Sequence, residues 1–529
     1  MRSSPLSDDS TAPFQLSQRQ IHLVFVGLMA GMLLSSLDQT VVSTAMPTIV
    51  GELGGLEHLS WVITAYLLTS TACMLLYGKL SDLYGRKLLL QIAIVIFLIG
   101  SLLSGLAQSM LQLIFFRGVQ GLGAGGIMIL SQAVVGDVIS PRERGRYQGY
   151  MGTVFGFSSV AGPLIGGFFT DHLTWRWVFY VNIPVAIAAL IVIQAALRLP
   201  VHRFEERRID YRGAFLMVGG ISALLLLTSW GGIEYAWGSP MIIGLGVAGV
   251  ALLALFLLQQ VRVPEPLLPL RLFRQKIFTV ATALSFVVGL GLLGAVSYLP
   301  VYFQVVRGAS ATMSGLQLAP LMGAVVIAVL VTGRLITTTG HYRIFPILGS
   351  AVMIVGMSLL AQLNENTSAW QSASYMALLG IGIGMLMQVP ILAVQNAVMH
   401  RDMGAATAGV NLFRSLGSAF GVAIFGSILN NRLTYELQQS IPSAALGQMS
   451  RRTLTASPEQ LKALPADIHA GVVHAFSLSL DAVFLWAVPL IAVAFIVSLF
   501  LQERPLREYA HVGAEDAVTP SMEGEAAGE

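Results

Sequence analysis

The sequence is poor in charge and almost free of cysteine. Only 11% of its 529 residues are Asp, Glu, Lys or Arg, whereas 55% are hydrophobic, and an ordinary soluble domain has about 25% charged residues. A single cysteine, Cys73, excludes an internal disulfide and gives no support to redox chemistry. Because so little charge could not cover the surface of a soluble chain of this length, we expect an integral membrane protein.

The patterns of enzymatic chemistry are missing as well. We find no nucleophile with an evident base and no set of His, Cys and carboxylates at metal-ligand spacing. The pattern G-x-x-x-x-G-K-[ST] is absent, and the two G-x-G-x-x-G matches, at 121–126 and 289–294, lie inside apolar runs rather than after a strand. We therefore predict a non-enzyme without a cofactor or metal, which draws its energy from an ion gradient rather than from ATP.

Long apolar runs dominate what the sequence does contain. A helix needs about 20 apolar residues to cross the hydrocarbon core of a bilayer, and fourteen such runs occur. No signal-peptide pattern precedes the first run, so we expect it to remain as a helix. The prediction is an all-α integral membrane protein with 14 transmembrane helices at 21–46, 59–79, 88–108, 110–136, 147–170, 176–197, 212–232, 240–261, 277–302, 312–337, 344–362, 370–399, 407–430 and 474–502.

The distribution of Lys and Arg predicts the orientation. Of the 30 basic residues, 22 fall in the loops that share a side with the termini, six fall in the opposite loops, and Arg117 and Arg414 lie within spans. Cytoplasmic loops carry the excess of basic residues. Both termini are thus predicted to be cytoplasmic, in a multi-pass protein of a bacterial cytoplasmic membrane. Because topology accounts for the net charge of +3, we expect no nucleic-acid partner.

The chain also repeats itself. The pattern G-[KR]-L with a second glycine seven residues after the first occurs at 78–85 and at 333–340, and R-[ED]-x-G occurs at 142–145 and at 401–404. Equivalent loops face the same side, which indicates two parallel six-helix bundles with two inserted helices, the plan of a rocking transporter. The predicted segments are a cytoplasmic tail 1–20, a bundle 21–200, a linker with two extra helices 201–275, a bundle 276–502 with an outer loop 431–473, and a disordered tail 503–529.

Two charged residues lie at membrane depth inside the first bundle, and one of them, Asp38, is a candidate for ion coupling. Asp38 and Arg117 both lie within apolar runs, where an ionised side chain is costly and usually faces a protein interior or a watery cavity. Burial favours the protonated form of a carboxylic acid, which suits a proton carrier. Gln120 shares the helical face of Arg117. The alternative for Arg117 is a purely structural pairing with backbone carbonyls.

The loop sequence GKLSDLYGRK at 78–87 suits a gate on the cytoplasmic side. Its glycines permit a tight turn, and Asp82, Arg86 and Lys87 can form charge pairs that hold two bundles in one state. Asp137, at the cytoplasmic end of the fourth span, is expected to join them. A loop whose basic residues only set the topology is the alternative.

At this motif the sequence resembles the major facilitator superfamily, and in particular its fourteen-span drug:proton antiporters. LDQTVV at 37–42 with Pro47 is similar to the first-helix motif, RGVQG at 117–121 to the fourth-helix motif, and GPLIGG at 162–167 to the fifth-helix antiporter motif. WRW at 175–177 with Asn182 and Pro184 fits the start of the sixth helix. The resemblance implies gating by Asp82 and Arg86 and proton coupling through Arg117.

In the fifth span, Gly162 and Gly166 lie four residues apart on one face, beside Pro163 and Gly167. Small residues at this spacing let helices approach closely, and Pro163 is expected to kink the span. Among members of the resembled family this motif separates exporters from importers. Close helix packing is the plainer interpretation, and both can hold.

Several polar residues are candidates to line a cargo cavity. A cavity for greasy cargo combines large adaptable surfaces with a few hydrogen-bonding groups, and we select Gln120, Tyr298 and Gln388 for this role. Arg414 and Asp481 have structural or solvated alternatives of equal or greater weight. A short surface helix is expected to begin at Ser457.

The predicted function is proton-coupled antiport that exports lipophilic small molecules by alternating access. The expected partners are such a small molecule, protons and membrane lipid, and the sequence does not identify a partner protein. One alternative is a dedicated exporter of a native lipid, siderophore or other metabolite. Another is a membrane sensor that transports nothing.

Overall fold

The computed structural model describes residues 18–54, 59–197, 210–232, 234–441 and 465–506. These residues form helices and no strand, because a chain surrounded by lipid must satisfy its backbone hydrogen bonds internally. Twelve of the helices are long and apolar enough to cross a membrane, and two shorter apolar helices cover Lys276–Gly291 and Ile344–Leu360. This agrees with the fourteen spans predicted from the sequence.

The first bundle contains the helices that precede residue 198. They are α1 (Gln18–Leu53), α2 (Leu59–Tyr84), α3 (Arg86–Gly105), α4 (Met110–Val138), α5 (Pro141–His172), the single turn α6 (Trp177–Tyr180) and α7 (Asn182–Ala196). Two extra helices follow, α8 (Tyr211–Trp230) and α9 (Pro240–Arg262). They pair with each other, and α8 also packs against α2 and α16 (Met403–Ser440).

The second bundle follows a short linker that contains the 3-10 helix η2 (Leu270–Arg274). Its elements are α10 (Lys276–Val301), the π-helix η3 (Tyr302–Val306), α11 (Ala311–Gln317), α12 (Ala319–Thr339), α13 (Ile344–Leu360), α14 (Ala369–Met387), α15 (Val389–Ala397), the 3-10 helix η4 (His400–Asp402), α16 and α20 (Ala466–Leu499).

Some helices differ from the predicted extents. The sixth predicted span is divided between α6 and α7, and the twelfth is divided between α14 and α15 at Gln388. Helices α16 and α20 also continue into the segment predicted as an outer loop, because their polar ends leave the apolar region as helix rather than as loop. The surface helix predicted to start at Ser457 lies outside the described residues.

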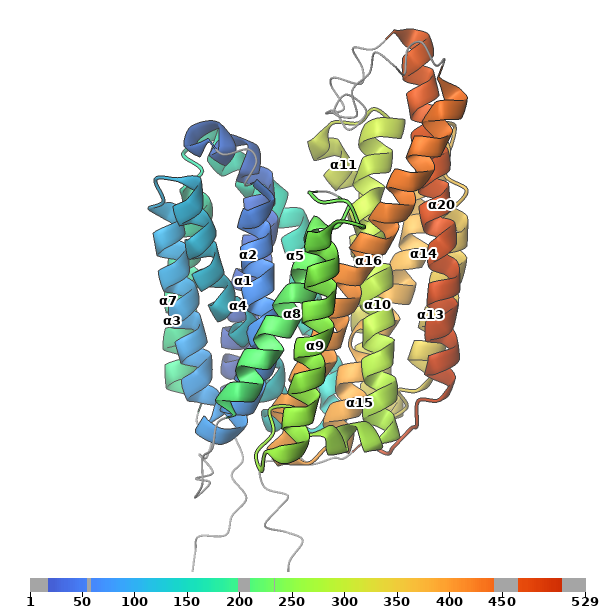
Figure 1. Cartoon of the computed structure of the whole chain (residues 1–529). Coiled ribbons are helices and arrows are strands. Elements are labelled where there is room, and N and C mark those ends of the chain that lie inside the picture. The colour runs from blue at the N-terminus through green and yellow to red at the C-terminus, as the bar shows by residue number, and fades with distance from the viewer. Residues whose placement is uncertain (1–17, 55–58, 198–209, 233, 442–464, 507–529) are drawn as a thin grey trace, which may run out of the picture.

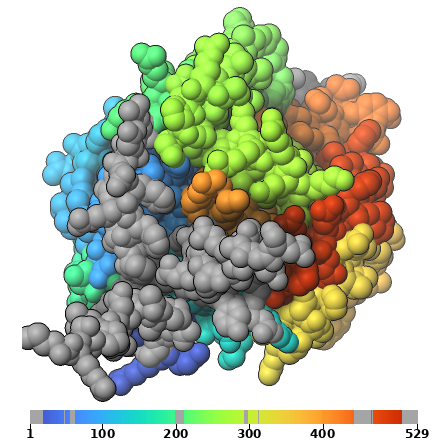
Figure 2. Space-filling view, turned by 90° about the horizontal axis from the view of Figure 1, so that it is seen from below, coloured from blue at the N-terminus to red at the C-terminus, as the bar shows by residue number. Residues whose placement is uncertain are grey.

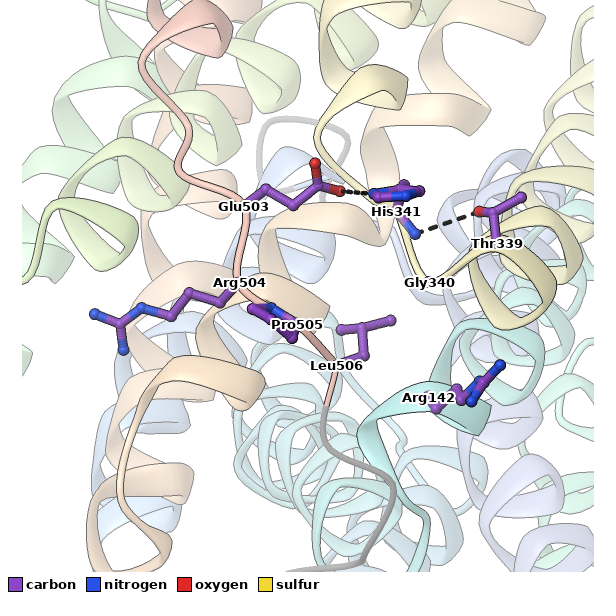
Figure 3. Close-up of a pocket in the computed structure, with 8 residues that line it drawn as sticks. All are labelled: Arg142, Thr339, Gly340, His341, Glu503, Arg504, Pro505 and Leu506. Atoms are coloured by element: carbon purple, nitrogen blue, oxygen red, sulfur yellow. Dashed lines mark hydrogen bonds and ion pairs between the residues drawn. The ribbon is translucent and has the colours of Figure 1, made fainter.

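Both ends of the described chain lie at one end of the molecule, which we call the terminal end (Figure 1). The segment after α20 crosses that end of the second bundle. Tyr342 Oη donates a hydrogen bond to Gln502 O (2.9 Å), Asn396 Nδ2 donates to Pro505 O (3.2 Å), and Glu503 lies against His341 (Figure 3). Burial raises the pKa of Tyr342, which keeps its hydroxyl a neutral donor.

The bundles touch along two seams at the terminal end and diverge away from it (Figure 1). In one seam a Cβ on Gly78 would lie 2.7 Å from Gly404 O, and in the other a Cβ on Gly145 would lie 2.7 Å from Gly333 O. These four glycines belong to the two repeated patterns of the sequence. In the first seam the G-[KR]-L pattern of the first half meets the R-[ED]-x-G pattern of the second half, and in the other seam the two patterns are exchanged. Two parallel repeats require this arrangement.

The glycine that ends each G-[KR]-L pattern has a backbone role. Gly85 and Gly340 have φ angles of 95° and 77°, in the left-handed region that glycine adopts without steric cost. Gly85 is the only residue between α2 and α3, and Gly340 ends α12. The tight turns that the loop motif predicts are therefore present in both halves.

Candidate functional site

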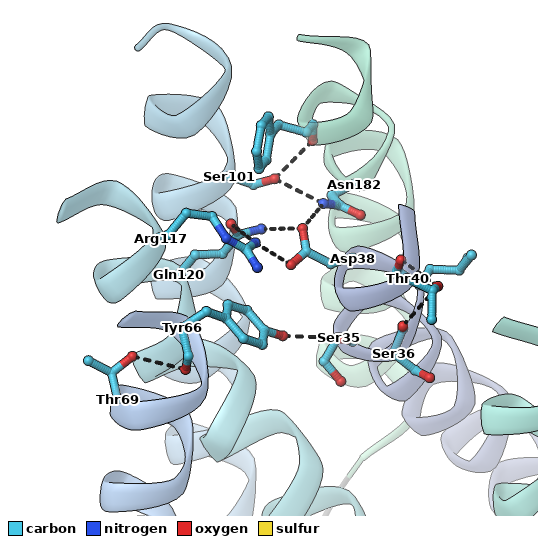
Figure 4. A network of polar contacts seen from close by, with 12 residues as sticks. Ser35, Ser36, Asp38, Thr40, Tyr66, Thr69, Ser101, Arg117, Gln120 and Asn182 are labelled. Atoms are coloured by element: carbon cyan, nitrogen blue, oxygen red, sulfur yellow. Dashed lines mark hydrogen bonds and ion pairs between the residues drawn. The ribbon is translucent and has the colours of Figure 1, made fainter. Parts of the chain in front are cut away.

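The Asp38 carboxylate is the centre of a buried polar network in the first bundle (Figure 4). Its Oδ2 atom accepts a hydrogen bond from Arg117 Nη1 of α4, which makes an ion pair. Its Oδ1 atom accepts from Gln120 Nε2 (2.8 Å) and from Asn182 Nδ2 (3.1 Å) at the start of α7. Asn182 Nδ2 also donates to Ser101 Oγ of α3 (3.0 Å). Residues of four helices thus belong to one network, and two of these helices, α4 and α7, donate directly to the carboxylate.

The Arg117 guanidinium is held on several sides. Its Nη1 atom also donates to Gln120 Oε1 (2.9 Å), and its Cζ atom lies 4.2 Å from the centre of the Tyr66 ring. A cation over an aromatic face is stabilised by the ring quadrupole. The Arg117 Nε atom is buried without a hydrogen-bond partner, so the Asp38 carboxylate supplies the main compensation for this charge.

In this conformation Asp38 faces the interior of the first bundle and not the space between the bundles. Asp38 and Arg117 are each 1% exposed. An apolar cluster that includes Trp175 and Phe179 lies beyond Asp38 and Arg117. It lies toward the end of the molecule opposite the terminal end, which we call the far end. The sequence predicted either a protein interior or a watery cavity around Asp38, and the structure shows a protein interior. The carboxylate can be buried there because Arg117 gives it a charged partner inside the bundle in place of water.

Gln120 belongs to this network and is fully buried. Its predicted contact with cargo stays a prediction. The contact of Asn182 with Asp38, and that of Ser101 with Asn182, were not predicted from the sequence. The detectable signal was polar residues inside otherwise apolar runs, but serine and asparagine are common enough in such runs that only their place in the Asp38 network distinguishes them.

A second charged cluster lies at the terminal end, where gating was predicted. Arg86 Nη1 pairs with Asp82 Oδ1 (2.5 Å) and Arg86 Nε pairs with Asp137 Oδ2 (2.9 Å). The Asp82 carboxylate also accepts the backbone N–H groups of Gly404 and Ala405 (3.2 Å each). These amides belong to the first turn of α16, where the helix dipole favours an anion. Asp82, on the first bundle, thereby binds the second.

The linker between the bundles is attached to the same region. Glu265 Oε2 pairs with Lys79 Nζ of α2 (2.5 Å), and Arg271 Nη2 of η2 donates to both carboxylate oxygens of Asp402 (2.8 and 3.0 Å). In the view of the terminal end, the linker lies beside the start of α16 (Figure 2). The insertion thus contacts both bundles beside the Asp82–Arg86–Asp137 cluster.

Further polar bonds join the bundles near this charged cluster. Asn411 Nδ2 of α16 donates to Gln132 Oε1 of α4 (2.7 Å), and Gln395 Nε2 of α15 donates to Gln132 O (3.1 Å). Arg414 Nη2 donates to Asn411 Oδ1 (2.5 Å). This contact orients the Asn411 amide and favours the structural interpretation of Arg414.

The glycines of the fifth-span motif pack against α1. A Cβ on Gly162 would lie 2.5 Å from Thr40 Cβ, and a Cβ on Gly166 would lie 2.8 Å from Val41 O. A Cβ on Gly167 would meet nothing within 4 Å. Helix α5 continues through Pro163. Two of the three glycines therefore permit close approach to the helix that carries Asp38.

This difference gives a matched pair of variants. Gly162→Ala is expected to destabilise the protein by about 1–3 kcal/mol, because the added methyl group overpacks the α1–α5 contact. Gly167→Ala, the same change five residues away, is expected to leave stability unchanged. Thermal unfolding in detergent measures both, and equal melting temperatures for the two variants would contradict the packing role of Gly162.

The two remaining candidates for a cargo contact lie in the second bundle. Tyr298 Oη donates to Val422 O (2.8 Å). Gln388 is 9% exposed, its Oε1 atom has no hydrogen-bond partner, and it borders a small cavity between α5 and α12. Asp481 of α20 has a buried Oδ1 atom without a hydrogen-bond partner. The cargo contacts of Tyr298 and Gln388 stay predictions.

At the far end of the first bundle, a salt bridge holds α6 against the end of α1. Glu52 Oε1 pairs with Arg176 Nη1 (2.5 Å), and Glu52 Oε2 accepts from Trp175 Nε1 (2.8 Å). The Arg176 hydrogen bond holds the pKa of the exposed Glu52 carboxyl below its usual value. The W-R-W motif thus fixes the apolar cluster that covers Asp38.

Curated relatives match most of this chain. It is 42% identical over 502 residues to an uncharacterized MFS-type transporter, Rv1877, of Mycobacterium tuberculosis, and the match covers 95% of this chain and 72% of the relative. It is 36% identical to the multidrug transporter protein MdtP of Bacillus subtilis, over 91% of this chain and 93% of the relative. Multidrug resistance protein 3 of Bacillus subtilis is 32% identical, over 95% and 99% of the two chains.

Solved structures and a family model agree with these relatives. The proton:xylose symporter XylE matches with a TM-score of 0.61 at 15% identity, over 94% of this chain and 99% of that one, a likeness that concerns the fold alone. The model of the Major Facilitator Superfamily matches residues 28–422. The chain has two six-helix bundles, and its relatives and the family model agree. It therefore belongs to the major facilitator superfamily and is a multi-pass membrane transporter.

Proposed function

We propose that the protein is a proton-coupled antiporter that exports lipophilic small molecules by alternating access. The observation that supports this most is the buried Asp38–Arg117 ion pair in the first bundle. It is a titratable carboxylate at membrane depth whose charge is compensated by one guanidinium. The names of the Bacillus subtilis relatives, a multidrug transporter and a multidrug resistance protein, support export of several small molecules.

Protonation of Asp38 couples to a change of conformation in this proposal. Breaking a buried ion pair by neutralising one partner leaves the other charge uncompensated, which costs about 3–5 kcal/mol. Arg117 then has to turn toward water or another acceptor, and the network with Gln120 and Asn182 has to rearrange with it. A proton taken up from outside thereby drives the bundle into its other arrangement, and cargo binds when the proton has left.

The gate provides the second half of the cycle. Because the loops at the terminal end hold the excess of basic residues, we assign that end to the cytoplasm, and the conformation described is then closed to the cytoplasm. Opening breaks the bonds from Asp82 to the α16 amides and exposes the cargo space to the inside. Asp82, Arg86 and Asp137 therefore act as the cytoplasmic latch.

The test is transport by purified protein reconstituted into vesicles. With an imposed pH gradient, several chemically unrelated lipophilic dyes are expected to move against their own gradients in the direction opposite to the protons. Reversing the pH gradient should reverse the direction of dye movement. Transport that is indifferent to the pH gradient would contradict proton coupling, and movement of one dye class alone would identify a dedicated exporter.

A further inference from the structure

A cavity at the terminal end of the α5–α12 seam receives one arginine from each bundle. Its volume is about 390 Å³. The side chains that line it are Arg146 and Tyr150 of α5 and Leu330, Arg334, Thr337 and Thr338 of α12. None of these residues belongs to the gate or to the Asp38 network, so the cavity is a separate feature of the molecule.

The positive charge of this cavity is only partly balanced. Arg146 Nε donates to Tyr150 Oη (2.9 Å), and the Arg146 backbone N–H donates to Thr337 Oγ1 (3.2 Å). Glu143, one turn earlier on α5, is exposed and acts on Arg146 electrostatically. Arg334 is exposed and, among the described residues, has no hydrogen-bond or ion-pair partner. An anion bound here would offset the repulsion between the two guanidinium groups and would accept charge-assisted hydrogen bonds from both.

Nearer the membrane centre, the exposed residues of α5 and α12 are apolar. On α12, Ile327 and Val331 are 63% and 50% exposed and precede Arg334 on the same helical face. On α5, Phe157 is 58% exposed and follows Tyr150 by two turns. The helices run antiparallel, so the apolar residues of both lie on the same side of the cavity. A basic cavity with exposed apolar side chains beyond it suits a phospholipid, whose headgroup is polar and whose chains are apolar.

We propose that this cavity binds the phosphate headgroup of an anionic glycerophospholipid, with an acyl chain against the exposed apolar side chains of α5 and α12. Basic pockets between transmembrane helices on the cytoplasmic side suit such headgroups. Because Arg146 and Arg334 belong to different bundles, the lipid contacts both only while the terminal end is closed. It therefore binds the closed arrangement more tightly and increases its population. This inference does not depend on proton coupling.

The experiment is native mass spectrometry of the full-length protein in neutral detergent, titrated with phosphatidylglycerol. Arg146→Gln/Arg334→Gln is expected to weaken the tightest lipid adduct roughly thirtyfold, since each basic contact contributes to binding. Arg334→Gln alone removes a side chain with no protein partner among the described residues, so it leaves the fold intact and should weaken the adduct about fivefold. The matched control, Arg212→Gln/Arg262→Gln, removes two exposed charges at the same end of α8 and α9 and should leave the adduct unchanged.

Three results would overturn the proposal. They are an equal loss in the control pair, an adduct of the same strength with phosphatidylcholine, and an unchanged adduct in Arg334→Gln. The source of the phosphate is distinguished by adding inorganic phosphate or glycerol 3-phosphate at the lipid concentration, and displacement of the lipid by either would assign the cavity to a free phosphate. Retention of the adduct in Arg146→Lys/Arg334→Lys would support recognition by charge.

Discussion

Asp38→Asn is expected to reduce gradient-driven efflux to the level of protein-free vesicles, while the variant still binds cargo. Asparagine keeps the shape of the side chain but cannot change its charge, so the event that couples proton movement to the conformational change is lost. The variant also leaves Arg117 buried without its carboxylate, which costs about 3–5 kcal/mol of stability. Dye efflux from vesicles with an imposed pH gradient and dye binding in detergent measure the two effects.

Two further variants separate coupling from folding. Asp38→Asn/Arg117→Gln removes both charges and should recover much of the lost thermal stability, but not coupled transport. Asp481→Asn is the matched control, because it makes the same change at another aspartate within a span, and it should transport as the wild type does. Undiminished gradient-driven efflux by Asp38→Asn would remove this carboxylate from the mechanism.

Gly78→Leu is expected to hold the terminal end open and to stop transport. Any Cβ at this position would lie 2.7 Å from Gly404 O and from Ala408 Cβ, so the closed seam cannot form without displacement of α2 or α16. Overpacking of about 3 kcal/mol shifts the equilibrium between closed and open states by roughly two orders of magnitude. Spin labels at Glu143→Cys and Thr339→Cys, on opposite bundles, should move apart in a Cys73→Ser background.

The control for this variant is Gly323→Leu on α12. A Cβ there would meet nothing within 4 Å, so the same added side chain should change neither the label distance nor transport. If the label distance in Gly78→Leu equals that of the wild type, the seam between Gly78 and Gly404 does not govern closure of the terminal end.

The pattern of apolar runs and the spacing of the repeats were sufficient to predict the fold. A span has to be apolar over a fixed length, and a backbone in lipid has to be helical. The repeated patterns with glycines at 78, 145, 333 and 404 indicated the two parallel bundles. These glycines recur because a close approach of two helix backbones needs glycine whatever the surrounding sequence. The rarity of charged residues within spans drew attention to Asp38 and Arg117, which the structure pairs in the interior of the first bundle, and their coupling role stays a prediction.

The sequence by itself determined which groups are available at membrane depth, because the cost of burial is a property of each side chain. Only the tertiary structure decided what those groups face. It paired Asp38 with Arg117 inside one bundle, joined Asp82 to the amides of α16, and brought Arg146 and Arg334 to one cavity from distant positions in the chain. Contacts between distant segments depend on how the helices pack, and the sequence around one residue does not say which distant residue that residue will meet.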